Sequence, residues 1–267
     1  RALDQRRILV FDRVAPWELA TARAHTNVTL VPYAAPTVHL LVPNPHSPLL
    51  TSGPIRRAIH AAIDRERILR DVLGDGAAPA GEVLSGPFPR GYAYDDNVLP
   101  AEHNPRTAIA LLHGEPAGEA PNAQPPRITL AYPRSDLARR GAMAIQEDLS
   151  LDGLGLQVTL REVTADDAWQ PASSWDLLYV EWQAMEPARD VWKLLGGTRW
   201  GRGADPELDA ALEQLAQAVS RAQAAAPLRA IHRRVREQLA LIPLWQIDEY
   251  ALVHRSLHGV GERPVTL

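Results

Sequence analysis

The sequence predicts an α/β fold in which a mixed sheet is covered by helices. Short strand-like runs alternate along the chain with longer segments whose apolar residues recur at helical spacing. The chain has 267 residues, of which 46% are hydrophobic, so it is long and apolar enough to bury a substantial core. This length is compatible with one or two domains.

The first 35 residues predict a strand, a helix and a second strand. Residues 8–11 and 28–31 have the apolar character of short strands. Pro16 suits the first turn of a helix over residues 16–24, because proline at that position costs no intrahelical hydrogen bond. We therefore expect a β-α-β beginning.

The next segment predicts a strand that leads through a proline-rich bend into one amphipathic helix. Residues 38–42 alternate in a β-prone run that ends at Pro43, whose missing N–H stops ladder pairing. The tripeptide at 52–54, Ser-Gly-Pro, suits a helix start, and apolar residues then recur at helical spacing over residues 55–73.

Helices and strands continue to alternate downstream. The proline- and glycine-rich stretch 114–126 has no periodicity and predicts a loop. The remaining helices are expected at residues 135–151, 206–219 and 226–241, and the strands at residues 128–132, 157–161, 177–182 and 250–253.

Composition and charge argue against several functions. The 28 basic and 32 acidic residues give a net charge of −4, and the basic residues are spread along the chain, unlike those of a nucleic-acid surface. Because no cysteine is present, the chain has no disulfide, zinc-thiolate or thiol chemistry. The longest apolar stretches fall short of the roughly 18 residues that a membrane-spanning helix needs.

Motifs of catalysis and cofactor binding are missing from the sequence. It has no G-x-S-x-G, no G-x-x-x-x-G-K-[ST] and no H-E-x-x-H. His254 and His258 lack an evident third metal ligand, and residues 95–97, Asp-Asp-Asn, lack the spacing of a calcium loop. We therefore expect a protein that is not an enzyme and that has no metal and no cofactor.

Motifs in a fixed order extend along much of the chain. The strand, bend and helix of residues 36–80 form the first motif, and Asn-Pro-Arg-Thr-Ala at 104–108, Asp-Pro-Glu-Leu-Asp at 205–209 and Ile-Pro-Leu at 242–244 follow downstream. Together they resemble the motifs of the family 5 extracellular solute-binding proteins, the peptide, dipeptide and nickel-type binding components of ABC importers. In the first motif, the residues that match the family's signature are Asn44, Pro48, Arg56, Ala58, Ile59, Ala62, Ile63, Asp64, Arg65, Ile68, Gly76, Ala78 and Pro79.

This resemblance implies a type II periplasmic-binding-protein-like lobe. The chain opens without a secretory signal pattern, so we expect the C-terminal portion of a larger two-lobe protein, truncated at its start. Residues 1–35 would belong to the hinge-side lobe and residues 36–267 to the C-terminal solute-binding lobe. The family's function would be the capture of a small or peptide-like solute by lobe closure and its delivery to an ABC permease.

The resemblance also implies a location outside the cytoplasm, a monomer, and no nucleic-acid partner for this segment. Because an isolated lobe leaves its cleft wall open, the segment alone is expected to bind solute poorly. One alternative stays open: the same lobe could be the effector-sensing domain of a transcription regulator.

Candidate ligand-binding residues follow the strand at 177–182, because open α/β sheets place ligands beyond the carboxyl ends of their strands. The resemblance matches Trp182 to a tryptophan that lines the cleft, and Met185 occupies the place of an acidic residue that meets a peptide's amino terminus. Gln183 is adjacent, and Glu186 would have to turn inward to replace that acid.

Two further candidates lie outside this segment. Trp169 resembles a second cleft tryptophan, and Asn44 lies where a strand of the family ends near the cleft. Core packing is the alternative for both Trp182 and Trp169, since tryptophan is highly buried on average. A turn is the alternative for Asn44, because Asn-Pro is itself a turn signal.

Overall fold

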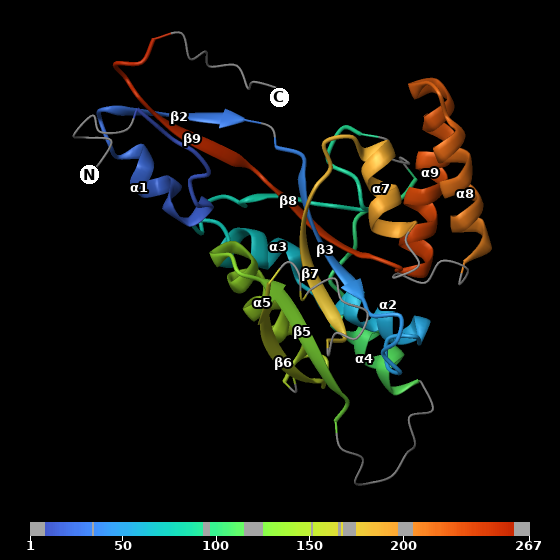
Figure 1. Ribbon diagram of the computed structural model, residues 1–267. Coiled ribbons are helices and arrows are strands. Elements are labelled where there is room, and N and C mark those ends of the chain that lie inside the picture. The colour runs from blue at the N-terminus through green and yellow to red at the C-terminus, as the bar shows by residue number, and fades with distance from the viewer. Residues whose placement is uncertain are drawn as a thin grey trace.

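The computed structural model describes residues 9–33, 35–92, 97–114, 125–150, 152–164, 167, 175–196 and 205–258, and it contains two sheets (Figure 1). The smaller sheet is antiparallel, with the strand order β1 (Val10–Phe11), β9 (Glu249–His254), β2 (Val28–Tyr33). The larger, mixed sheet has the order β4 (Gly81–Val83), β8 (Ile242–Ile247), β3 (Thr37–Pro43), β7 (Leu177–Gln183), β5 (Arg127–Pro133), β6 (Gln157–Val163).

The strand directions place the ends of several strands at one edge of the larger sheet. Strand β5 runs parallel to both β6 and β7, whereas β3 runs antiparallel to both β7 and β8. The carboxyl ends of β5, β6, β7 and β8 therefore lie at the same edge as the start of β3. This is the edge at which open α/β sheets bind ligands.

Two short connections join the sheets at that edge. Residues 35 and 36 lead into β3 from the side of β2, and Asp248 alone separates β8 from β9. The Gln246 side-chain Nε2 donates a hydrogen bond to the Ala35 carbonyl at 2.8 Å, so the two crossings are tied to each other. Because β9 pairs with β1 and β2, the last described strand shares a sheet with the first two. The predicted division at residues 35 and 36 stays a prediction.

Helices cover both faces of the larger sheet, which gives two cores (Figure 1). Residues of β7 alternate between the cores: Leu177 and Tyr179 face one, and Leu178 and Val180 face the other. The first core is covered by α2 (Gly53–Ala62), α3 (Arg65–Arg67), η2 (Ile68–Val72), α4 (Pro105–His113) and α5 (Asp136–Leu149). The second is covered by α7 (Pro187–Leu195), α8 (Pro206–Gln217) and α9 (Arg221–Gln238).

A small third core lies under the smaller sheet. Val14, Leu19 and Ala22 are buried there, where η1 (Pro16–Glu18) and α1 (Leu19–Arg23) pack against the sheet. The expected strand, helix and strand at the beginning of the chain are therefore present, with β1 described from residue 10 onward.

The α/β fold with a mixed, helix-covered sheet is confirmed, and the strands predicted from residue 28 onward are present. Strand β8 is not predicted by the sequence pattern. Every residue of β8 is buried, so its sequence lacks the alternation that reveals a half-buried strand. Of the loop predicted at 114–126, residues 115–124 lie outside the described part of the chain.

The single helix expected over residues 55–73 is wrong, because the chain breaks after Ala62. Ile63 has an extended backbone, with φ −76° and ψ 117°. The Asp64 carboxylate then accepts the Arg67 amide at 2.9 Å and caps a new helix. Apolar periodicity continues across the break, so the sequence pattern does not reveal it.

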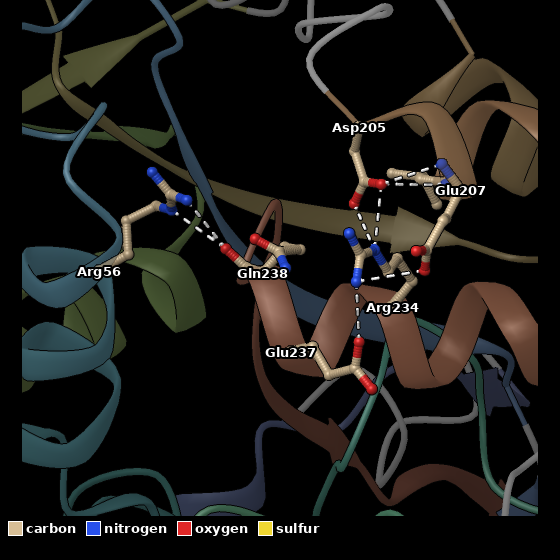
Figure 2. Close-up of polar contacts among 7 residues, drawn as sticks. Arg56, Asp205, Glu207, Arg234, Glu237 and Gln238 are labelled. Atoms are coloured by element: carbon tan, nitrogen blue, oxygen red, sulfur yellow. Dashed lines mark hydrogen bonds and ion pairs between the residues drawn. The ribbon is translucent and has the colours of Figure 1, made fainter.

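Two arginines hold helix ends together on the α9 side of the molecule (Figure 2). Arg234 contacts Asp205 at 2.7 Å and Glu237 at 3.1 Å, which joins α9 to the first residues of α8. Arg56 of α2 donates from Nε and Nη2 to the carbonyl of Gln238, at 3.2 and 3.0 Å. Gln238 ends α9, and Leu239 follows it in the left-handed region at φ 51°. A cation at this place satisfies a helix carbonyl that has no intrahelical partner.

Replacing Arg56 by alanine is expected to lower the free energy of unfolding by about 1–3 kcal/mol, because charge-assisted bonds to helix-end carbonyls are lost. The loss includes the bonds from Nη1 to the carbonyls of Leu50 and Thr51. Urea unfolding measures it. The matched control is Arg57→Ala, one exposed position further along the same helix. Equal destabilisation by both substitutions would contradict the capping role.

Candidate functional site

A cavity of about 430 Å³ lies at the edge where the two sheets meet. We call it the crossover pocket. It is lined by residues 13–17, 135–137 and 247–249, together with Thr37 and His39 from β3 and Glu181 and Gln183 from β7. The smaller sheet and the larger sheet thus both contribute to one cavity.

The alternation of β7 decides which of its residues face the pocket. Tyr179 points toward the core beneath α5, and Glu181 and Gln183 continue on that face. Trp182 points to the other face, where it is half-buried against the core beneath α7 to α9.

Glu181 lies between the start of α5 and the residues that precede η1. The hydroxyl of Ser135, the residue that caps α5, donates to Glu181 Oε1 at 2.7 Å. Burial of the carboxyl group raises the pKa of Glu181. The Ser135 hydrogen bond and the charge of Arg13 lower this pKa, whereas the charge of Glu249 raises it further. The carboxylate is nevertheless accessible from the pocket.

Three other carboxyl groups line the pocket, and each has a partner. Glu249 accepts a hydrogen bond from the Tyr33 hydroxyl at 2.7 Å, and burial, followed by the nearby carboxylates, raises the pKa of Tyr33. Asp136 pairs with Arg139 at 3.0 Å, and Asp248 pairs with Arg90.

His39 forms a buried polar part of the lining. Only 2% of its surface is exposed, and its Nδ1 is 3.0 Å from the Tyr179 hydroxyl. Burial lowers the pKa of His39 to about 3, so the ring is neutral at neutral pH.

Residues 13–17 form the opposite wall of the pocket. Arg13 has a φ of 54°, a backbone conformation that is costly for a residue other than glycine. The guanidinium carbon of Arg140, on α5, lies 4.2 Å from the centroid of the Trp17 ring. This cation–π contact joins the segment before α1 to α5 across the boundary of the two sheets.

Of the residues predicted to bind ligand, the pocket contains Gln183. Its neighbours Trp182, Met185 and Glu186 lie at the same end of β7 but do not line this cavity. Met185 is 60% exposed, and Glu186 precedes α7, where its amide donates to Asp190 Oδ2 at 3.0 Å.

Asn44 lies at the opposite end of β3 from Thr37. Its Nδ2 donates to the Trp175 carbonyl at 2.7 Å, and its Oδ1 accepts the His46 amide at 2.9 Å. The structure therefore does not bring Asn44 together with Gln183. Trp169 lies outside the described residues.

The sequence analysis did not identify Glu181, His39, Trp17 or Arg13 as site residues. A signal existed for two of them. His39 and Glu181 are polar residues within otherwise apolar strand runs, and such residues either find a partner or line a cavity.

A second cavity, of about 530 Å³, lies between α7 and the turn from α8 to α9, and none of the predicted ligand-binding residues lines it. In the described part of the chain, no three His, Asp or Glu side chains cluster as metal ligands do. The described helices also include none with the length and hydropathy that crossing a membrane requires.

The family model described as "Bacterial extracellular solute-binding proteins, family 5 Middle" matches residues 1–201. None of the curated proteins matches the sequence significantly. Several solved structures do resemble it in fold, and the chain spans about half the length of each.

The periplasmic binding protein DppA of Helicobacter pylori, solved with the peptide STSA, has a TM-score of 0.80 and 17% identity over 99% of this chain and 52% of its own. NikZ of Campylobacter jejuni, solved with Ni(L-His), has a TM-score of 0.79 and 18% identity over 98% of this chain and 55% of its own. The oligopeptide-binding protein AppA of Bacillus subtilis, solved with a nonapeptide, has a TM-score of 0.76 and 19% identity over 97% of this chain and 54% of its own. The periplasmic-binding-protein fold expected from the sequence is confirmed.

Proposed function

Because the chain belongs to family 5 of the bacterial extracellular solute-binding proteins, we propose that the protein carrying it captures a small or peptide-like solute for an ABC importer. The family is one of binding proteins and not of enzymes. The single observation that carries the proposal is the family match over residues 1–201. A cavity at the carboxyl ends of the strands is consistent with it.

The proposed mechanism is the closure of two lobes over the solute. In such proteins a few residues between lobes absorb the change in backbone angles, and the ligand stabilises the closed form by binding it better than the open one. Of the described residues, the connections between the two sheets, residues 35–36 and Asp248, are short enough to act in this way. The closed form would then be presented to a membrane permease.

We propose that the solute contacts the end of β7 and the turn after it. Gln183 lines the crossover pocket, and Trp182, Met185 and Glu186 flank it along the chain. Trp169 and Asn44 remain predictions. Peptides and a nickel–histidine complex are the ligands of the structures named above, and a solute of either kind is a candidate here.

Location outside the cytoplasm and a monomeric state are also parts of the proposal. The location is supported by the family, whose description is of extracellular proteins. Neither the family match nor the named structures support the alternative of an effector-sensing domain in a transcription regulator.

The proposal is tested by identifying the solute that the full-length protein retains. The protein is purified without added ligand and unfolded, and the released small molecules are identified by mass spectrometry. We expect one solute class at near-stoichiometric amount, reduced in Gln183→Ala. The control is Gln157→Ala, at the exposed start of β6 and therefore at the opposite edge of the sheet. A protein that retains no solute, and binds none of a panel of peptides and nickel–histidine in calorimetry, would refute the proposed function.

A further inference from the structure

We propose that the crossover pocket binds a positively charged group of the solute, an ammonium or a guanidinium, with the Glu181 carboxylate as its main partner. This inference rests on the proposed function and adds the chemical class of the ligand. It depends on how the charges of the lining are paired, on a ring nitrogen of the lining residue His39 that has no hydrogen-bond partner among the described residues, and on the size of the cavity.

The lining of the pocket is acidic, and its charges are unevenly paired. Among the described residues it contains Asp136, Glu181, Asp248 and Glu249 against one cation, Arg13. The two aspartates each pair with an arginine, Arg139 and Arg90. The two glutamates have no arginine, lysine or histidine nitrogen within 4 Å among the described residues, and they accept hydrogen bonds from the neutral hydroxyls of Ser135 and Tyr33.

Glu181 in particular has room for a further donor. Ser135 occupies its Oε1, whereas its Oε2 has no donor in the described part of the chain. A carboxylate that is partly withdrawn from water and lacks a cation is stabilised by a ligand that brings one. The cavity of about 430 Å³ has space for such a group and for part of the molecule that carries it.

His39 is an independent indication that a polar ligand enters the pocket. It is 2% exposed and belongs to the lining, and its Nδ1 is taken by the Tyr179 hydroxyl. Its Nε2 has no hydrogen-bond partner among the described residues. In the tautomer with the proton on Nδ1, Nε2 is an acceptor for an N–H donor in the cavity. The side-chain oxygen of Gln183 is a second such acceptor, because no hydrogen bond occupies it in the same part of the chain.

An anionic group fits this pocket less well. It would have to approach Arg13, whose side chain is 68% exposed and already lies 3.8 Å from Asp12. It would also meet the unpaired charges of Glu181 and Glu249. A neutral group would leave both of these charges without a cation.

The test uses two isosteric probes, n-butylguanidinium and n-butylurea, which differ in charge. Each is titrated against the full-length protein, freed of retained solute, with saturation-transfer difference NMR as the readout. We expect butylguanidinium to bind about tenfold or more tightly than butylurea, since hydrogen bonds to a carboxylate are stronger when the donor is also charged. Glu181→Gln should remove that preference.

The matched control is Glu162→Gln, an exposed strand carboxylate on β6 that pairs with Arg134 outside the pocket; it should leave both affinities unchanged. Glu181→Gln should fold, and its thermal midpoint at pH 7 should be equal or higher, because the raised pKa means that the fold disfavours the charged form of Glu181.

Equal affinity for the two probes, no binding of butylguanidinium, or an unaltered preference in Glu181→Gln would each overturn the inference. The proposed function would survive any of these results if mass spectrometry identifies a retained solute. A protein that retains no solute but prefers butylguanidinium would contradict the function and leave the cation site in place.

Discussion

Arg65→Ala is expected to lower the free energy of unfolding by about 3–5 kcal/mol. The Arg65 side chain is 2% exposed and runs into the first core. Its Nε donates to the Pro243 carbonyl at 2.9 Å, and its Nη1 donates to the carbonyls of His60 and Ile63, at 2.9 and 3.1 Å. One guanidinium therefore satisfies the broken end of α2 and joins it to β8.

Two opposing effects decide the size of this loss. No carboxylate lies within 4 Å of Arg65 in the described part of the chain, and burial, with the charge of Arg236, lowers its pKa to about 9. Removing the charge therefore relieves a desolvation cost. We expect the loss to dominate, because three buried carbonyls lose the donors that Arg65 supplies and a large side-chain volume is left empty.

Urea unfolding of three variants separates these effects. Arg65→Met retains most of the volume but not the donors, so its loss should be smaller than that of Arg65→Ala yet still measurable. Arg70→Ala, which removes an exposed arginine that pairs with the adjacent Asp71, is the control. If Arg65→Ala lowers the free energy of unfolding by less than about 1 kcal/mol, the relief of the desolvation cost offsets the lost hydrogen bonds.

Acidification from pH 7 to pH 5 is expected to lower the free energy of unfolding by about 4 kcal/mol. Two buried histidines are responsible. Burial lowers the pKa of His39 from 6.5 to about 3, and burial, with the charges of Arg65 and Arg236, lowers that of His60 from 6.5 to about 2. Both rings are therefore neutral in the folded protein throughout this pH range.

The direction follows from which state binds protons. Between pH 6.5 and pH 3 the unfolded chain protonates these histidines and the folded protein does not, so the stability present above pH 6.5 falls with pH. A pH of 5 lies about 1.5 pH units below the pKa of each histidine in the unfolded chain, so each contributes a loss of about 2 kcal/mol in the free energy of unfolding. The contribution of Glu181 to this pH dependence has the opposite sign, because its raised pKa stabilises the folded state as the pH falls. Since Glu181 is accessible to solvent, its contribution is smaller.

Urea midpoints at the two pH values measure this effect. His60→Leu should remove about half of the pH dependence, since its ring is buried and makes no hydrogen bond in the described part of the chain. His46→Leu, at an exposed position, should leave the dependence unchanged. An equal pH dependence in wild type and His60→Leu would exclude the histidine explanation.

Much of the local structure could be predicted from the order of the residues. Short β-prone apolar runs bounded by proline or polar residues identified β3 and β7, although both strands are buried over most of their length. Capping signals were also informative: the Ser52 hydroxyl accepts the Ile55 amide at the start of α2 as its position suggested. The family motifs added the fold, which the matched structures share.

Other features depend on contacts between distant parts of the chain. Helical apolar periodicity continues across the break after Ala62, and strand β8 lacks a clear alternation of polar and apolar residues. Only the inward turn of Arg65 and burial on both faces define these two features. The α9 helix begins five residues before its predicted start, because Ser220 caps it and Pro227 is tolerated in its second turn.

Periodicity, caps and ordered motifs thus determined the element types, the fold class and the family, because these depend on residues a few positions apart. The crossover pocket depended on tertiary structure. It requires residues 13–17, β3, the start of α5, the end of β7 and residues 247–249 to meet at one edge. Strand pairing across more than 200 residues, such as that of β2 with β9, brings these parts together, and no local pattern encodes which strands will pair.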